Sequence, residues 1–372
     1  MLRRIRQRLM VSPKGSKDPV MLCGYYGEHN LGDDALLAVL LCQLPEGCRP
    51  LITAYDQSAV ACAFTAETVD RRNPAAVFAA LGRCRALVLG GGSLLQDSTS
   101  FASLLYYVLL ILAARSQNKP VLLWAQGLGP LRRRRSRGLV RFVLARISGA
   151  SWRDEESARL AQQLGCRYDL VGSDPVWGLD SGAWQGPGGP IVLCWRPVAT
   201  LSPPEWSLYL RAVATLAERL DRRVVWLPFH REQDSGLLGA LHEQGLVPAG
   251  LLARSSSMRP DTPAEAIELL SSAALVVAMR LHGLILAALA GAPVVALSYD
   301  PKVAAAAAAI GCDCRHLGAN HPAADSLDTV LSAWSASVEQ PTDARRLLEL
   351  RHQAEVHRTV LRGLMPEASF KP

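Results

Sequence analysis

The sequence predicts an α/β fold made of two Rossmann-like, doubly wound domains that face each other across a cleft. At 372 residues the chain is longer than one hydrophobic core usually serves, so two domains are expected. Unbroken apolar runs of strand length alternate with segments of helical period, which indicates parallel sheets covered by helices on both faces. A Gly- and Pro-rich break at residues 180–190 interrupts this alternation and is typical of an interdomain linker.

The expected strands follow in order on both sides of the break. Those before it are VMLCGYYG, RPLITAY, RALVLGGGS, PVLLWAQGLG, GASWRDE and YDLVGSDPV, and those after it are IVLCWRP, RRVVWLPFH, AALVVAM and APVVALSYD. These runs predict an N-terminal domain over residues 18–179 and a C-terminal domain over residues 191–320. Residues 321–372 are expected to form a helical segment that packs back across the domains.

Composition indicates a soluble globular protein, with 49% apolar and 20% charged residues. The longest apolar run, residues 101–114, is shorter than the ~18 residues of a membrane span, so we expect a buried helix there. The basic start MLRRIRQRLM precedes no apolar signal-peptide core, which favours a cytoplasmic protein. Nine scattered cysteines show no ligand spacing, and we expect neither a metal nor a cofactor.

The net charge of +7 is gathered in local runs, notably LRRRRSRG at residues 131–138 and the N-terminal RRIRQR. A solvated loop is the plain interpretation of the first run. The alternative partner is an anionic surface, such as the inner face of the membrane, or an acidic polymer. Nucleic acid is not expected, because no recognition motif or series of stacking aromatics accompanies the charge.

Three glycine-rich turns follow strands of the N-terminal domain, where ligands of doubly wound sheets bind. In GYYGEHNLGDDA, residues 24–35, Asp33 and Asp34 are candidates to cap the next helix, and Asp33 is also a candidate for a role at the cleft. In the next turn Gly91 and Gly92 allow a nest of N–H groups that could hold an anion or a sugar hydroxyl. Gln126, in WAQGLGP, could donate a hydrogen bond to a sugar.

Arg153 lies where the predicted fifth strand becomes a helix. A guanidinium there can present its planar fork to a carboxylate or phosphate. Ion pairing with a neighbouring acid is the alternative. Because adjacent side chains in a strand point to opposite faces, we expect Asp154 to be a poor partner.

The stretch AMRLHGLILAALAGAPVVALSYDPK, residues 278–302, places cationic groups in an apolar segment. Residues 280–283 are expected to form the turn between a strand and a helix, where Arg280 and His282 add to the positive end of the helix dipole. The next strand brings Lys302 to the same edge of the sheet. Three cationic groups there repel one another unless an anion joins them, which predicts a small, highly charged substrate.

These motifs, with RDEES and SDPVW, resemble the polysaccharide pyruvyl transferase family, the CsaB type in particular, in the same order over roughly residues 20–320. The resemblance implies a fold similar to B-type glycosyltransferases. It also implies transfer of pyruvate from phosphoenolpyruvate to a sugar of a cell-surface polysaccharide or its precursor. The product is a cyclic pyruvate ketal, and phosphate is released.

The resemblance also assigns roles to individual residues. It places phosphoenolpyruvate at Arg153, His282 and Lys302, supported by Arg280 and the N–H groups around Gly283. It places Asp33 beside the acceptor. The proton transfers of ketal formation add the hypothesis that Asp33 is the base, aided by the amide of Asn30, and that His282 is the general acid. The chain reads GDDA where family members commonly carry GDE, so no role is assigned to Asp34. The acceptor is expected to be a glycan, either free or lipid-linked, at the cytoplasmic face of the membrane.

Three other functions stay open. A nucleotide-sugar glycosyltransferase or 2-epimerase would need an acidic residue for the ribose, for which Glu265 is available. A non-catalytic anion or glycan sensor would tolerate the loss of His282. A nicotinamide oxidoreductase is the weakest alternative, because the dinucleotide glycine pattern is absent.

Overall fold

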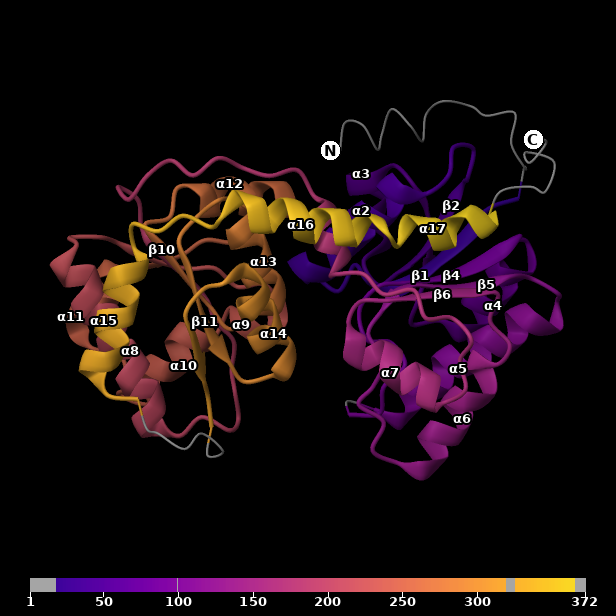
Figure 1. The fold of residues 1–372 in the computed structure, drawn as a ribbon, viewed down its shortest axis with the longest axis horizontal. Coiled ribbons are helices and arrows are strands. Elements are labelled where there is room, and N and C mark those ends of the chain that lie inside the picture. Colours follow the sequence, from indigo (N-terminus) through magenta and orange to yellow (C-terminus); the bar gives the residue numbers. More distant parts are fainter. Residues whose placement is uncertain (1–17, 99, 319–324, 365–372) are drawn as a thin grey trace. The chain divides into compact units, whose positions relative to one another are not determined.

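The computed structural model describes residues 18–98, 100–318 and 325–364, which divide into two compact units. Unit 1 takes its described residues from 1–28, 33–179 and 350–372, and unit 2 from 29–32 and 180–349. Figure 1 follows the chain through both units. The basic N-terminal run considered above lies outside the described residues.

Unit 1 holds a six-stranded parallel sheet in the order β3-β2-β1-β4-β5-β6. Its strands are β1 (Val20–Tyr26), β2 (Pro50–Ala54), β3 (Glu67–Asp70), β4 (Ala86–Gly90), β5 (Val121–Gln126) and β6 (Gly149–Trp152). The intervening helices are α2 (Leu31–Gln43), α3 (Gln57–Phe64), α4 (Pro74–Gly82), α5 (Phe101–Ser116), α6 (Arg134–Leu144) and α7 (Glu155–Gln163). All residues of β2, β4 and β5 are buried, as expected for strands covered on both faces.

Unit 2 repeats this arrangement in the order β12-β11-β10-β7-β8-β9. Its strands are β7 (Ile191–Cys194), β8 (Val224–Trp226), β9 (Ser255–Ser257), β10 (Leu275–Ala278), β11 (Val294–Ser298) and β12 (Cys314–His316). Its helices are α8 (Pro203–Arg219), α9 (Arg231–Asp234), α10 (Leu237–Glu243), α11 (Ala249–Arg254), α12 (Pro263–Ser271), α13 (Leu281–Leu289), α14 (Pro301–Ile310) and α15 (Leu327–Ser337).

In both sheets the strand order reverses between the first and fourth strands in sequence, as in a doubly wound fold. In unit 1 the reversal lies between β1 and β4, and in unit 2 between β7 and β10. Ligands of such folds bind beyond the carboxyl ends of the strands at this point. The predicted pair of Rossmann-like sheets is therefore confirmed. Each unit has one candidate ligand-binding crevice, at the point where its strand order reverses.

The strand predictions were wrong in two respects. YDLVGSDPV is not a strand: its Val171 forms an isolated bridge with Trp152, and a 3-10 helix, η1 (Pro175–Gly178), follows. The edge strands β3, β9 and β12 were missed, because they have only three or four residues and polar sequences, ETVD, SSS and CRH. The strand that leads to Arg153 is consequently the sixth in sequence and not the fifth.

Residues 180–190 pack on unit 2 through backbone and side-chain hydrogen bonds. The N–H of Gly182 donates to the carbonyl of Leu289 at 2.9 Å, and the Trp184 indole N–H donates to the carbonyl of Ala273 at 2.8 Å. This Gly- and Pro-rich stretch is thus held along its length by the second unit.

The C-terminal segment returns the chain from unit 2 to unit 1. Helix α16 (Ala344–Glu355) contributes residues to both units, and α17 (Arg358–Leu361) and the 3-10 helix η2 (Arg362–Leu364) belong to unit 1. His357 is fully buried there. Its Nδ1 lies 3.0 Å from the hydroxyl of Ser151, and its Nε2 lies 2.7 Å from the carbonyl oxygen of Ser173. Burial lowers the pKa of His357, although the hydrogen bond to Ser173 opposes the shift.

Candidate active site

Two glycines of the first crevice make room for a buried tyrosine. A Cβ atom at Gly24 would lie 2.4 Å from Cζ of Tyr26, and one at Gly90 would lie 2.3 Å from its hydroxyl oxygen. That hydroxyl donates to the carbonyl of Gly90 at 2.6 Å. These two glycines of the predicted ligand turns therefore have a packing role within unit 1.

The loop after β4 takes its shape from Gly91 and Gly92, whose φ angles are +73° and +70°. The N–H of Gly91 donates to the carbonyl of Trp124 at 2.8 Å, so this member of the predicted nest is already used. Gln126 is fully buried, and its amide nitrogen donates to the carbonyls of Gly91 at 2.9 Å and Leu89 at 3.2 Å. The side chain thus fixes the glycine loop, and its contact with a sugar stays a prediction.

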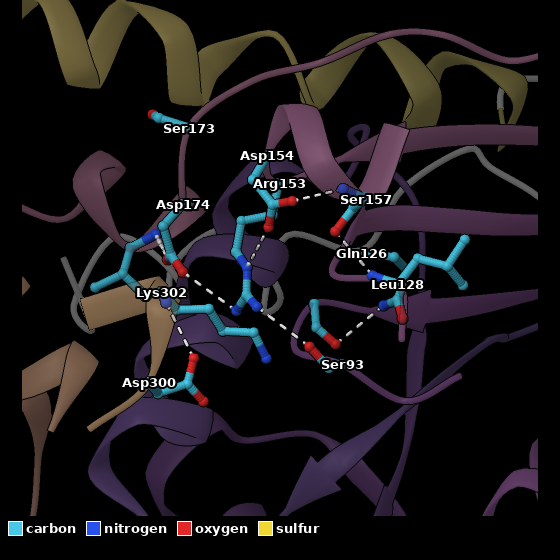
Figure 2. Close-up of polar contacts among 12 residues, drawn as sticks. Ser93, Gln126, Leu128, Arg153, Asp154, Ser157, Ser173, Asp174, Asp300 and Lys302 are labelled. Carbon is cyan, nitrogen blue, oxygen red and sulfur yellow. Dashed lines mark hydrogen bonds and ion pairs between the residues drawn. The ribbon is translucent and has the colours of Figure 1, made fainter. Parts of the chain in front are cut away.

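Arg153 is buried at the end of β6, with 8% of its surface exposed. Figure 2 shows its guanidinium reaching Ser93, with Nη2 donating to the hydroxyl oxygen at 3.2 Å, and Asp174, with Nη1 3.5 Å from Oδ2. A Cβ atom at residue 127 would lie 2.6 Å from Nη2 of Arg153, so glycine there lets the guanidinium keep its position. The structure thus gathers Arg153 with the loops after β4 and β5.

The expectation that Asp154 is a poor partner for Arg153 was wrong. Oδ2 of Asp154 lies 3.7 Å from Nε of the arginine, while its Oδ1 caps α7 by accepting from the N–H of Ser157 at 2.7 Å. The strand rule does not apply, because β6 ends at Trp152 and both residues lie beyond it. Arg153 therefore has two carboxylates nearby, and buried Asp174 is the one that the local sequence did not reveal.

The helix after β1 begins at Leu31, and Asn30 caps it by accepting from the N–H of Gly32 at 3.0 Å. Asp33 and Asp34 were predicted as possible caps, but they lie inside the first helical turn. Carboxylates in that turn interact favourably with the helix dipole. Asp33 is half-buried and belongs to unit 1, whereas Asn30 belongs to unit 2.

In unit 2, the N-terminus of α13 lies directly after β10. Arg280 is its N-cap residue, and Leu281, His282 and Gly283 form its first turn; a separate turn over residues 280–283, as predicted, is therefore wrong. A Cβ atom at Gly283 would lie 2.7 Å from Cβ of Cys194, so this glycine lets α13 approach β7 closely. The helix N-terminus consequently stands at the reversal point of the sheet.

Arg280 is held by an acid that the sequence analysis missed. Its Nε donates to Oδ2 of Asp234 at 3.0 Å, its Nη2 contacts Oδ1 of the same residue, and Nη2 also donates to Gln233 at 3.1 Å. Oδ2 of Asp234 accepts from the N–H groups of Phe229 and His230 as well, at 3.1 and 2.8 Å. The anion that joins Arg280 is therefore a buried protein carboxylate, which corrects the expectation that only a substrate could do so.

Residues 29–32, although they follow β1 in sequence, pack beside His282. Asn30 forms an antiparallel bridge with His230, and the N–H of Leu31 donates to the carbonyl of Phe229 at 3.0 Å. A Cβ atom at Gly32 would lie 2.0 Å from Nδ1 of His282. The structure thus places the predicted Asn30 motif and the predicted general acid in one cluster.

Lys302 lies in the first turn of α14, directly after β11. Asp300 caps this helix, accepting from the N–H of Lys302 at 3.0 Å, a contact also drawn in Figure 2. Because β10 and β11 are neighbouring parallel strands, the helices that carry His282 and Lys302 begin at the same edge of the sheet. Two helix N-termini side by side favour an anion there.

The predicted residues therefore fall into two groups. Asp33, Gly91, Gly92, Gln126 and Arg153 lie in unit 1, and Asn30, Arg280, His282, Gly283 and Lys302 lie in unit 2. The sequence predicted no role for Ser93, Gly127, Asp174 or Asp234. Asp234 could have been suspected, because a polar run, HREQD, follows the strand that ends in VVW.

Glu265, the candidate ribose ligand of the alternative function, has a local role. Its carboxylate accepts from the N–H of Asp261 at 3.0 Å, and its own N–H donates to the hydroxyl of Thr262 at 3.2 Å. Thr262 thus caps α12, and the carboxylate of Glu265 binds the N–H of the residue before this cap. These contacts account for the acidic residue at this position.

The fold recurs among solved structures of sugar-nucleotide enzymes. HepE of Anabaena in complex with UDP-glucose is 12% identical, with a TM-score of 0.56, and covers 94% of this chain and 100% of its own. UDP-GlcNAc 2-epimerase of Neisseria meningitidis is 12% identical, with a TM-score of 0.58 and coverage of 92% and 100%. The 2-epimerase of Methanocaldococcus jannaschii is 10% identical, with a TM-score of 0.59 and coverage of 93% and 98%. At such identities these likenesses show the fold alone.

A search of curated protein sequences gives no match. The family profile described as polysaccharide pyruvyl transferase, however, matches residues 30–301. The match begins at the capping Asn30, includes Arg153 and the start of α13, and ends one residue before Lys302. Because it covers more than half of the sequence, the chain belongs to the polysaccharide pyruvyl transferase family.

Proposed function

We propose that the chain transfers pyruvate from phosphoenolpyruvate to a sugar and forms a cyclic pyruvate ketal. The observation that carries this proposal is the edge of unit 2, where α13 and α14 begin on neighbouring strands with His282 and Lys302 in their first turns. This arrangement suits a small, multiply charged anion. Family membership supplies the reaction class.

Phosphoenolpyruvate carries a carboxylate and a phosphate on the same carbon, and each group needs its own cationic partner. In the proposal, the α13 and α14 N-termini with Lys302 hold the phosphate, and the guanidinium of Arg153 holds the carboxylate. Arginine suits a carboxylate because its planar fork can donate two hydrogen bonds. The cationic side chains supply the charge stabilisation, so the proposed reaction uses no metal.

The proposed chemistry balances without a further reactant. His282 protonates the methylene carbon, which becomes the methyl group, and one sugar hydroxyl attacks the adjacent carbon. The C–O bond to phosphate then breaks, and a second hydroxyl closes the ketal ring. Of the two protons that leave the hydroxyls, one replaces the proton given by His282 and the other leaves with phosphate.

Asp33 is the proposed base for the sugar hydroxyl, and Asn30 is the proposed orienting amide. An imidazole can act as a general acid, which suits His282 to the first step. Gly91, Gly92 and Gln126 are proposed to lie on the acceptor side. The acceptor is a glycan or a lipid-linked glycan, reached in the cytoplasm, with peripheral contact with the inner face of the membrane.

A phosphate-release assay tests this proposal. Release from phosphoenolpyruvate that depends on an added sugar acceptor, and disappears in His282→Ala, is the expected result. The thermal unfolding midpoint should also rise with phosphoenolpyruvate, because a ligand that binds the folded state stabilises it.

UDP-GlcNAc and UDP-glucose are the comparison ligands, since solved structures of the same fold hold UDP-glucose and UDP. Stabilisation by a UDP-sugar without any effect of phosphoenolpyruvate would overturn the proposal in favour of a nucleotide-sugar enzyme. Binding of phosphoenolpyruvate that survives in His282→Ala, with no turnover in either protein, would indicate a sensor.

A further inference from the structure

One surface of unit 1 concentrates the positive charge of the chain. Residues 101–146 contain nine Lys and Arg and no Asp or Glu, whereas the whole chain has a net charge of +7. All other residues together therefore sum to −2. Within the described part of the chain, α5, α6 and the segment between them thus carry a large surplus of positive charge.

Seven arginines around α6 are exposed to solvent, while the apolar face of the helix is buried. They are Arg132, Arg133, Arg134, Arg135, Arg137, Arg141 and Arg146. Within residues 18–98, 100–318 and 325–364, none of these guanidiniums forms an ion pair with a carboxylate. Repulsion among them opposes folding, and an external anionic partner would relieve it.

Exposed apolar side chains occur on α5 and α6 as well. Leu105 and Leu109 of α5 are 36% and 47% exposed, and Phe142 of α6 is 46% exposed. The two leucines are four residues apart and therefore share one helix face. The guanidinium carbon of Arg135 lies 4.1 Å from the ring centroid of Phe101, and that of Arg146 lies 3.5 Å from the ring of Phe142. The helix that was predicted to be buried here is therefore buried on only part of its surface.

A buried carboxylate anchors this surface to the sheet. Asp97, in the loop after β4, accepts from the N–H groups of Arg132 at 2.8 Å and Arg133 at 2.9 Å. Burial alone would raise the pKa of Asp97, but these hydrogen bonds hold it below its ordinary value. The carboxylate thus binds the backbone and leaves the arginine side chains turned outward.

We propose that α5 and α6 form a docking surface for a membrane rich in anionic phospholipids. The guanidiniums would contact headgroup phosphates, and Leu105, Leu109 and Phe142 would enter the boundary with the acyl chains. An acidic polymer or nucleic acid would use the arginines but would leave the leucines without a partner, so the mixed surface favours lipid. Figure 1 shows α5 and α6 side by side in unit 1.

Among residues 18–98, 100–318 and 325–364, none of the helices is long and apolar enough to cross a bilayer. The inference rests on the peripheral membrane contact in the proposed function, and it is independent of the identity of the donor.

Flotation of the full chain with lipid vesicles tests the surface. Binding is expected to vesicles of phosphatidylcholine with phosphatidylglycerol and not to phosphatidylcholine alone. It should be lost near ~1 M salt, where the screening length falls to ~3 Å. Equal binding to both kinds of vesicle, or to neither, would overturn the proposal.

Charge reversal locates the surface on the molecule. The triple variant Arg134→Glu, Arg135→Glu, Arg137→Glu should bind anionic vesicles at least about a hundredfold more weakly. Acidic residues suit the first turn of a helix, so the variant is expected to fold, which circular dichroism checks. The control carries the same charge change in unit 2, at Arg211, Arg219 and Arg223, and should bind markedly better than the α6 variant. Equal losses in both would show that only net charge matters and would overturn the assignment.

Substitution of the two exposed leucines distinguishes a lipid membrane from an acidic polymer as the partner. Leu105→Ser with Leu109→Ser should weaken vesicle binding and leave retention on heparin unchanged. Unchanged vesicle binding in this variant would sink the lipid assignment in favour of an acidic polymer. Turnover with a water-soluble acceptor should be unaffected by all of these changes, so failure of docking and failure of the transferase proposal are distinguishable.

Discussion

Arg280 and Asp234 are joined at two points, with Nε of the arginine 3.0 Å from Oδ2 of the aspartate and Nη2 in contact with Oδ1. The side chain of Asp234 is completely buried, and that of Arg280 is 12% exposed. The same carboxylate receives the N–H groups of Phe229 and His230. The pair therefore ties the loop after β8 to the start of α13, where the donor site is proposed.

Removal of this carboxylate should destabilise the protein. Asp234→Ala leaves Arg280 as an unpaired, nearly buried charge, and we expect a loss of about 3–5 kcal/mol in the free energy of unfolding. Urea denaturation measures it. Because the two side chains act together, the losses in Asp234→Ala and Arg280→Ala should not add in the double variant. Additive losses would show that the contact contributes nothing to stability.

Gly32 should control the position of the His282 ring. A methyl group at residue 32 would meet Nδ1 of the imidazole at 2.0 Å, so Gly32→Ala is expected to displace the ring. Turnover should fall about a hundredfold, the effect of a misplacement of roughly 1 Å. Steady-state phosphate release measures the change.

The matched control for this substitution is Gly250→Ala in α11, where an added Cβ meets nothing within 4 Å. It should keep full turnover. Unchanged turnover in Gly32→Ala as well would remove His282 from the chemistry or show that its ring is free to move.

Arg153 and Lys302 should each contribute to donor binding. Arg153→Ala and Lys302→Ala are expected to weaken phosphoenolpyruvate binding by about 1.5–3 kcal/mol, typical of a lost charge-assisted contact. Titration calorimetry measures the affinity. Arg159→Ala, an exposed arginine of α7, is the control and should bind the donor normally. Full donor affinity in both test variants would take both residues out of the site.

His357 should make stability depend on pH. Its pKa is lowered in the folded protein, so the unfolded chain takes up a proton first as the pH falls through ~6.5. The free energy of unfolding is then expected to decrease below that pH, by up to ~1.4 kcal/mol per pH unit, and to be constant above it. Urea midpoints between about pH 7.5 and 5.5 measure this slope.

The variant His357→Gln should lose that part of the slope, although it is also less stable at neutral pH because two buried hydrogen bonds are broken. His352→Gln changes an exposed histidine of α16 and should keep the wild-type slope. Identical slopes in wild type and His357→Gln would contradict the buried, neutral histidine.

The doubly wound architecture could be predicted because its central strands are apolar along their whole length. Strands such as LVLG in β4 and VLLWAQ in β5 are buried on both faces, and that burial is visible as an unbroken apolar run. The edge strands could not be predicted in this way. SSS in β9 takes its place from pairing with β8 and not from its own side chains.

Individual residues of the candidate site could be predicted from the sequence, but their ion-pair partners could not. Arg153 was found because it follows an apolar strand, yet its buried partner Asp174 lies 21 residues further on, after an irregular segment. Arg280 and Asp234 are likewise separated by 46 residues. Only the folded chain brings such charges together, because the pairing depends on neighbouring strands that are distant in sequence.

The absence of acidic residues between positions 101 and 146 has a kinetic consequence. A protein whose positive charge is concentrated on one side experiences a torque near an anionic membrane. It therefore rotates before it makes contact with the lipid. The chain would then arrive with α6 leading, without a random search over orientations. Encounter rates, and not only the tightness of attachment, should therefore fall as the ionic strength rises.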